Sequence, residues 1–304
     1  MGQGKSVLIY SHLIIIIMEL TAYLQQQYTP GTAVSYGREI GIFLSNYPQA
    51  AAAVYSDLLG YIGVLRQRYG NAQTLNRIVC SIKVYYDYLC YTGQREDHPG
   101  RNIWLRDQRS RDVQLQDLFS ASELSMLMGR KERFKALFYR NEVLIGLLVY
   151  QGLLIGEMAS LCVAEIDLEG GTVYIRETAV TNSRKLPLHA NQVLPLSAYL
   201  EGARAQLLGG RASEALLISQ RGQPMQASDI SKHVKRRYSG LFPGRKVTAQ
   251  SIRQSVIANL LAQGHDISKV QQFAGHRYPS STERYRQDHV GRLQAIIDQY
   301  HPVK

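Results

Sequence analysis

Cysteine is scarce in this chain of 304 residues, and the scarcity excludes several kinds of site. The 3 cysteines are Cys80, Cys90 and Cys162, and they form no Cys-x-x-Cys pair. Histidine and cysteine do not recur with the spacing of zinc ligands. We therefore expect reduced thiols in core or helical surroundings, with neither a disulfide framework nor a bound metal.

Long apolar runs and phosphate-binding glycine loops are missing as well. Residues 7–18 are apolar, but Ser11 and His12 interrupt a run that is too short to span a bilayer. No small-residue cleavage site follows, so a signal peptide is disfavoured. Within the N-terminal extension of residues 1–18, the first seventeen residues are interpreted as an over-extended reading frame, with Met18 as the natural start. The first glycines lack the spacing of a P-loop. We expect no membrane partner and no cofactor.

Acidic residues are too few to balance the basic ones. The chain has 35 Lys and Arg against 24 Asp and Glu, a formal net charge of +11 and a pI of about 9.5. Such an excess favours a polyanionic partner, usually nucleic acid, through phosphate contacts and counterion release. Hydrophobic residues make up 45%, enough for packed cores, and the length suits two domains.

Residues 19–98 show the periodicity of a small helical bundle. Residues 29–32 are predicted to break the first helix, with Thr32 capping the second. A third helix is predicted over residues 55–69, and a long fourth one follows Asn71 and ends at Thr92-Gly93. The side chains expected to face inward include Val34, Ile40, Phe43, Leu44, Leu58, Leu59, Ile62 and Leu65.

Residues 99–117 are polar and charged, and they predict a linker, either a solvated connector or a basic strap. Residues 118–304 form the second predicted domain, opening with a capping box at Ser120. Residues 172–176 alternate like a strand and residues 185–188 are extended, which predicts a small β-hairpin among helices. Helices are also expected over residues 141–151, 195–208 and 229–238. The predicted fold class is mainly α with a small β-hairpin sheet.

The last fifth of the chain carries its most informative residues. Arg253 opens an amphipathic helix, Phe273-Ala-Gly-His276 follows the next helix, and Tyr285 stands nine residues further on in a polar segment. This order and spacing resemble the tyrosine recombinases, a family of DNA strand-exchange enzymes that includes phage integrases. The resemblance covers nearly all the chain after Met18. It implies an N-terminal core-binding domain and a C-terminal catalytic domain.

The chemistry explains why these residue types belong together. Cutting DNA without metal or ATP requires a hydroxyl that attacks the phosphorus, cationic donors for the transition state and a proton for the leaving oxygen. A tyrosine nucleophile stores the bond energy as a phosphotyrosine. The resemblance implies that Tyr285 is this nucleophile, that Arg253 holds the phosphate bidentately, and that His276 hydrogen-bonds the scissile phosphate.

Several positions depart from the family pattern. Leu154 stands where the family has its first arginine, and loss of one such donor costs about 10²–10³ in rate. Gln250 replaces a histidine, so it donates a hydrogen bond but transfers no proton. The family's hairpin lysine is expected near Ala179, where none stands; Lys185, with Arg184 beside it, reaches the site if the hairpin register differs.

Basic residues on both predicted domains are candidates for contact with DNA. They are Arg77, Lys83, Arg184, Lys232, Lys235 and Arg236. The expected partner is double-stranded DNA, bound by a homo-oligomer from dimer to tetramer or by a hetero-oligomer with another recombinase. The resemblance places such a protein in the bacterial cytoplasm, at the nucleoid.

Three hypotheses remain open. The first is an active recombinase of a mobile element, in which Arg176, Arg184 or a partner subunit supplies the missing guanidinium. The second is a catalytically impaired pseudo-recombinase that regulates DNA or assists an active partner. The third is a helical interaction scaffold, which the net charge of +11 disfavours. An apolar stripe of Val290, Leu293, Ile296 and Ile297 predicts a terminal helix that either mediates oligomerisation or docks on its own domain.

Overall fold

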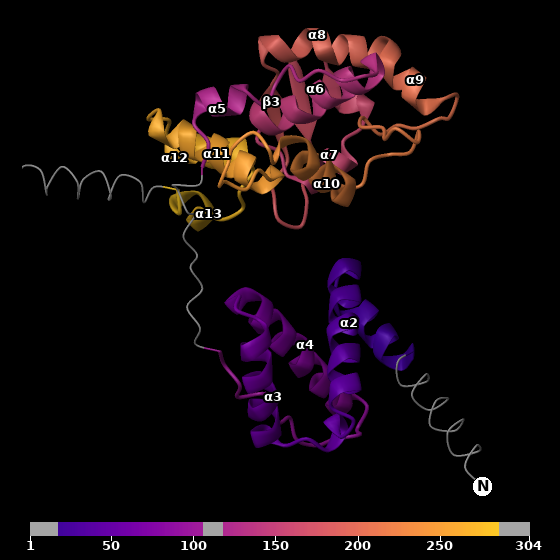
Figure 1. Ribbon diagram of the computed structural model, residues 1–304, viewed down its shortest axis with the longest axis vertical. Helices are drawn as coiled ribbons and strands as arrows, with labels where there is room; N and C mark the ends of the chain where they lie inside the picture. The colour runs from indigo at the N-terminus through magenta and orange to yellow at the C-terminus, as the bar shows by residue number, and fades with distance from the viewer. Residues whose placement is uncertain (1–17, 106–117, 286–304) are drawn as a thin grey trace, which may run out of the picture. The chain divides into compact units, whose positions relative to one another are not determined.

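The computed structural model describes residues 18–105 and 118–285 and divides into two compact units, Met1–Ser110 and Arg111–Lys304 (Figure 1). The division falls within the stretch 99–117 that was predicted as a linker. The N-terminal extension, the basic part of the linker and the C-terminal apolar stripe lie outside the described residues. None of the described helices is long and apolar enough to cross a membrane.

The N-terminal unit is a helical bundle built around an aromatic core. Residues 18–27 are helical, and the main helices that follow are α2 (Pro30–Asn46), α3 (Tyr55–Arg68) and α4 (Ala72–Tyr91), with a short 3-10 turn, η1 (Ala50–Ala52). Phe43 packs edge-on against Tyr61, Tyr85 and Tyr86, with ring centroids 5.0, 6.2 and 6.4 Å away. The buried Tyr86 hydroxyl donates to the carbonyl of Ala50 at 2.8 Å. Several of the chain's tyrosines are therefore packed in this core.

Some expectations for this unit were wrong in detail. Helix α2 begins at Pro30, with Thr29 rather than Thr32 at its N-cap, because proline at the first helical position has no N–H to leave unpaired. Val34 is 74% exposed and Leu59 is 45% exposed, so both lie on outer faces of their helices. Ile103 is buried in the bundle core, so packed structure continues past residue 98.

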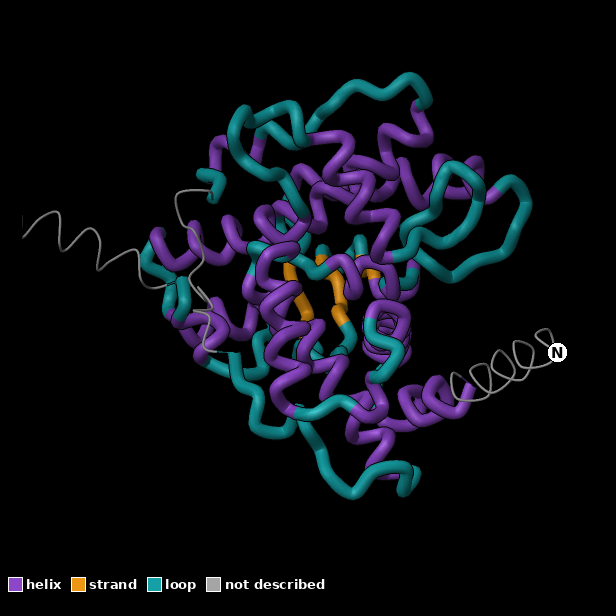
Figure 2. Tube along the Cα trace, turned by 60° about the horizontal axis from the view of Figure 1, so that its bottom comes forward, coloured by secondary structure: helices purple, strands orange, loops and turns teal. Residues whose placement is uncertain are grey.

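The C-terminal unit packs helices around the largely buried α6 (Lys135–Val149) and a small sheet, whose strands are orange in Figure 2. The sheet has three antiparallel strands in the order β1 (Ile166–Asp167), β2 (Thr172–Ile175) and β3 (Arg184–Pro187). Tyr174 pairs with Lys185 and Ile175 with Arg184. The predicted mainly helical class with a small hairpin sheet is therefore confirmed.

The remaining helices close over this core. They are α5 (Ala121–Ser125), α7 (Ile155–Ser160), η3 (Val163–Glu165), α8 (Ala190–Ala198), the π-helical η4 (Tyr199–Ala203), α9 (Arg204–Leu208), α10 (Ala227–Tyr238), α11 (Ala249–Ala262), α12 (Ile267–Ala274) and α13 (Ser280–Glu283). Ser120 and Glu123 form the expected capping box. The helix predicted from residue 195 starts earlier, at Ala190, with His189 capping it and Pro195 inside.

The cysteines do not all lie in the core. Cys80 is exposed, while Cys90 and Cys162 are half-buried, and all are free thiols. Cys80 and Cys90 lie in the helix α4, as expected, but none of the three thiols is fully buried in a core.

Candidate active site

Arg253 lies on the second turn of α11 and is 3% exposed. Its Nη1 donates to the carbonyl of Gly152 at 2.5 Å, and its Nη2 donates to the carbonyl of Ala274 at 2.6 Å. Burial lowers the pKa of Arg253 to about 10, so the guanidinium is protonated at neutral pH. The side chain therefore joins the segment before α7 to the end of α12 and carries its charge inside the unit.

His276 follows Gly275, which ends α12 in the left-handed region at φ 68°. The His276 Nδ1 lies 2.8 Å from Oγ1 of the buried Thr282. Burial, then the charges of Arg253, Arg284 and Arg184, lowers the pKa of His276 to about 4. The imidazole is therefore neutral at pH 7, and Nε2 is left for a ligand.

Tyr285 is 7% exposed and packs with Ile257, Leu261, Val270 and Ala274. The polar segment before it thus ends in a buried ring. Burial raises the pKa of the Tyr285 phenol, while the charges of Arg253 and Arg284 and a hydrogen bond from Gln254 act in the opposite direction. The phenol is therefore protonated at neutral pH in this state.

Arg184 and Glu157 form a buried ion pair next to these residues. The Arg184 guanidinium contacts Glu157 through Nη1–Oε1 at 2.8 Å and Nη2–Oε2 at 3.0 Å, and its Nε donates to the carbonyl of Phe273 at 2.8 Å. Thr181 donates to the same carboxylate at 2.8 Å. Burial acts to raise the pKa of Glu157, but the bonds and charge of Arg184 outweigh it and the pKa is lowered. Arg184, expected to contact DNA, is committed to the interior.

Gly275 is needed for this arrangement. A Cβ on Gly275 would lie 2.4 Å from Nη1 of Arg184 and 3.1 Å from the carbonyl of Asn182, well inside contact distance. The Asn182 amide also donates to the carbonyl of Gly275 at 2.9 Å. The Gly-His pair therefore lets β3 and the end of α12 approach closely, which places His276.

Lys185 points away from Arg184, because neighbouring strand residues face opposite sides. Its Nζ lies 3.8 Å from Oδ2 of Asp167, and the side chain is 62% exposed. Lys185, Lys269 and His276 nevertheless line one cavity of about 550 Å³ beside β3 and α12. The hairpin lysine is therefore near His276, on the rim of the site.

The residues that depart from the family pattern, Leu154 and Gln250, lie on the elements that carry the candidate site. Leu154 is half-buried at the N-cap of α7, and its amide donates to Oε2 of Glu157 at 2.9 Å. Gln250 is exposed in the first turn of α11, one turn before Arg253. Arg176 is paired with Glu165 at 2.5 Å. Leu154 thus sits beside the carboxylate and glycine that frame the site, without a charge of its own.

The other basic candidates fall into two groups. In the N-terminal unit, Arg77 donates to Ser35 at 2.9 Å and to Glu39 at 3.0 Å, and the Lys83 Nζ lies 4.2 Å from the centre of the Trp104 ring. In the C-terminal unit, Lys232, Lys235 and Arg236 share α10 and line a cavity of about 650 Å³. Among the described residues, none of these three side chains forms an ion pair.

Sequence reasoning missed the groups that hold the site in position. Thr282 lies 2.8 Å from Nδ1 of His276, and Glu157 pairs with Arg184. A threonine between the Gly-His pair and the tyrosine was a weak signal. Among the described residues, no group of three or more His, Cys, Asp or Glu is placed to hold a metal ion.

A mainly helical unit with a small sheet, in which an arginine, a histidine and a tyrosine approach one another, is the arrangement of a DNA strand-exchange enzyme of the tyrosine type. Residues 117–292 match the profile of the phage integrase family. The match spans more than half of the chain, and the chain belongs to this family.

Relatives and solved structures agree with this assignment. The chain is 27% identical over 255 residues to tyrosine recombinase XerC of Myxococcus xanthus, covering 83% of each, and 26% identical over 248 residues to XerD of Oceanobacillus iheyensis, covering 81% and 82%. Its fold is similar to XerH recombinase bound to its difH substrate, with TM-score 0.69, 18% identity and coverage of 88% and 80%. The Tn1549 transposon integrase in complex with transposon right end DNA gives TM-score 0.68, 17% identity and coverage of 94% and 99%.

Proposed function

We propose that this protein binds double-stranded DNA and breaks and rejoins it through a 3′-phosphotyrosine formed on Tyr285. The observation that carries the proposal is the contact network around one buried guanidinium. Arg253 bonds the carbonyl next to the Gly-His pair, and its charge acts on both His276 and Tyr285. The site residues are Tyr285, Arg253 and His276, with Gln250 and Lys185 at its rim.

The chemistry follows from these groups. The Tyr285 oxygen bonds phosphorus as the P–O5′ bond breaks. The phenol proton passes to water, and the leaving 5′-oxygen takes a proton from Lys185, the nearest hairpin donor. Arg253 has five N–H groups, of which two are engaged with carbonyls, so the others are available for the phosphate oxygens. Neutral His276 offers a further hydrogen bond through Nε2. Attack of a 5′-hydroxyl on the phosphotyrosine reverses the step and rejoins a strand.

We infer that the setting is a mobile element in a bacterial cytoplasm, on nucleoid DNA, with dimers to tetramers assembling on paired sites. Support comes from bacterial recombinase relatives and from fold neighbours that include a transposon integrase bound to DNA. We further infer two domains, a core-binding domain predicted over residues 19–98 whose packing continues to the buried Ile103, and a catalytic domain over residues 118–304.

A pseudo-recombinase is the second candidate, and Leu154 favours it. Its apolar side chain occupies the position of the first arginine, beside the carbonyl segment that Arg253 bonds. Gln250 cannot transfer a proton. Such a protein would bind DNA as a regulator or as the non-cleaving partner of an active recombinase.

A nicked suicide substrate separates the two candidates. We expect a covalent protein–DNA adduct with the natural chain, formed equally in EDTA, and none with Tyr285→Phe. Phenylalanine keeps the buried ring, so the variant should retain its fold and its DNA affinity. Binding without adduct by the natural chain would support the pseudo-recombinase, and an adduct that survives in Tyr285→Phe would assign the nucleophile elsewhere.

The state of His276 predicts the pH profile of adduct formation. Its pKa of about 4 keeps the imidazole neutral across the range in which free histidine titrates. From about pH 5 to about pH 8, titration of His276 should therefore add no break to the rate profile, so the natural chain and His276→Gln should have profiles of the same shape. A break near pH 6.5 that this substitution abolishes would show that His276 titrates with an ordinary pKa in the complex, and would contradict this prediction.

A further inference from the structure

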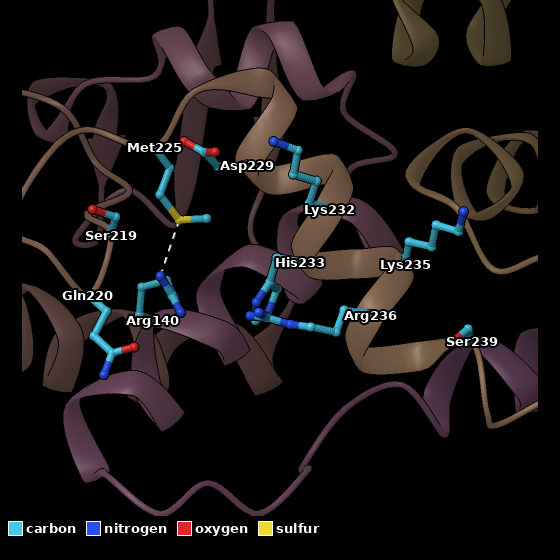
Figure 3. A pocket seen from close by; sticks show the side chains of 10 residues that line it. All are labelled: Arg140, Ser219, Gln220, Met225, Asp229, Lys232, His233, Lys235, Arg236 and Ser239. Carbon is cyan, nitrogen blue, oxygen red and sulfur yellow. Dashed lines mark hydrogen bonds between the residues drawn. The ribbon is translucent and has the colours of Figure 1, made fainter.

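A cavity of about 650 Å³ lies between α10, α6 and the turn after residue 218 (Figure 3), and its lining does not include Tyr285. Half of its lining is basic, from Arg140, Lys232, His233, Lys235 and Arg236, and Asp229 is the acidic member. The rest of the lining is Ser219, Gln220, Met225 and Ser239.

Arg140 places a buried guanidinium in the cavity lining, and the residue is 6% exposed. Its Nε donates to Oδ1 of Asn141 at 2.7 Å, and its Nη1 donates to the carbonyl of Ile218 at 3.1 Å. Among the described residues, no carboxylate forms an ion pair with it. Burial lowers the pKa of Arg140, which reflects a guanidinium held away from water without a counter-charge in direct contact.

His233 is the unexplained group. It is 9% exposed, and its buried Nε2 has no hydrogen-bond partner among the described residues. Burial, followed by the charges of Arg140, Arg236 and Arg237, lowers its pKa to about 4. A buried nitrogen left unpaired beside several cations costs free energy unless a ligand with oxygen atoms occupies the space.

The side chains converge from separate elements. Figure 3 shows Arg236 and His233, from α10, extending toward Arg140 of α6, while Lys235 points away. The Asp229 carboxylate is occupied with the Gln226 amide at 3.3 Å. Two guanidinium groups and an imidazole that share one space fit a compact anion with several acceptor oxygens.

We propose that this cavity binds a phosphate group, held by Arg140, His233 and Arg236. Under the proposed function, on which this assignment rests for its natural ligand, the phosphate belongs to the DNA backbone and anchors α10 on the duplex. The anion supplies the missing counter-charge and an acceptor for His233. A free phosphate has the same chemistry, so the test treats the two sources separately.

The first arm measures phosphate without DNA. The ¹⁵N shifts of His233, assigned by comparison with His233→Gln, are followed in the full chain as inorganic phosphate replaces chloride at constant ionic strength. We expect a saturable shift with a raised pKa, weakened about tenfold or more by Arg236→Gln. The matched control is Arg221→Gln, which removes the same charge from a neighbouring turn outside the cavity lining. No saturable shift, or equal weakening by both variants, overturns the proposal.

The second arm adds duplex DNA. If the backbone is the ligand, DNA displaces phosphate from His233, and Arg236→Gln lowers the slope of log affinity against log salt by about 1. If DNA and phosphate bind together, the cavity takes a free phosphate compound. If phosphate binds as expected and DNA does not bind at all, the proposed function fails while the phosphate site stands.

Discussion

Leu154→Arg should raise covalent adduct formation on a nicked substrate by about 10²–10³, the scale of one preorganised transition-state donor. The reason is position. Leu154 is half-buried at the N-cap of α7, two residues after Gly152, whose carbonyl Arg253 bonds, and its own amide bonds Glu157. A guanidinium placed there would face the same phosphate from the opposite side to Arg253.

The control for this variant is Leu154→Met, which keeps an apolar side chain of similar volume and should leave the rate unchanged. If an unidentified arginine already fills the space, Leu154→Arg would crowd it, and activity would stay flat or fall. If Leu154→Arg, alone and combined with Gln250→His, gives no adduct on any DNA that the protein binds, the active-enzyme proposal must give way to the pseudo-recombinase.

Glu157→Gln should lower the free energy of unfolding by about 3–5 kcal/mol, because it leaves the buried Arg184 guanidinium without its counter-charge. The double variant Glu157→Leu with Arg184→Met removes both charges and should regain most of that loss. Urea unfolding of the single and double variants measures the difference. Equal stability of Glu157→Gln and the natural chain would show that the pair is not formed in solution.

The same pair predicts a pH dependence. The folded pKa of Glu157 lies below its ordinary value of 4.5, so the ionised pair stabilises the fold fully above that value. The stability difference between the natural chain and Glu157→Gln should be constant at neutral pH and shrink as pH falls below about 4.5 toward the folded pKa. A difference that grows with acid would contradict the assignment.

Much of the fold was predictable because its signals are local. The capping box at Ser120, the Asn71 cap of α4 and the strand alternation around Val173 each depend on neighbours in sequence. Exposure of Val34 and Leu59 was not predictable, since the helix pattern gives an apolar stripe but not which edge of it is covered.

The sequence indicated which residues make up the candidate site, but not their burial or their hydrogen-bond partners. The spacing of Arg253, His276 and Tyr285 follows from short helices, whereas burial of the tyrosine ring depends on α11 and α12 together. The role of Arg184 depends on Glu157, 27 residues away in sequence, and on a glycine small enough to admit it. Pairings between residues so far apart in the chain produce no pattern in the local sequence.

The two hydrogen bonds from Arg253 to backbone carbonyls give this arginine a structural role as well as a proposed catalytic one. Alanine at this position would leave the carbonyls of Gly152 and Ala274 unpaired inside the unit, at about 1–3 kcal/mol each. Selection for a stable fold would therefore retain the arginine in a lineage that had ceased to cut DNA. The Tyr285 hydroxyl has a smaller structural task, since phenylalanine would fill the same apolar space. A tyrosine rather than a phenylalanine at residue 285 is thus a better indication of the proposed catalysis than an arginine at residue 253.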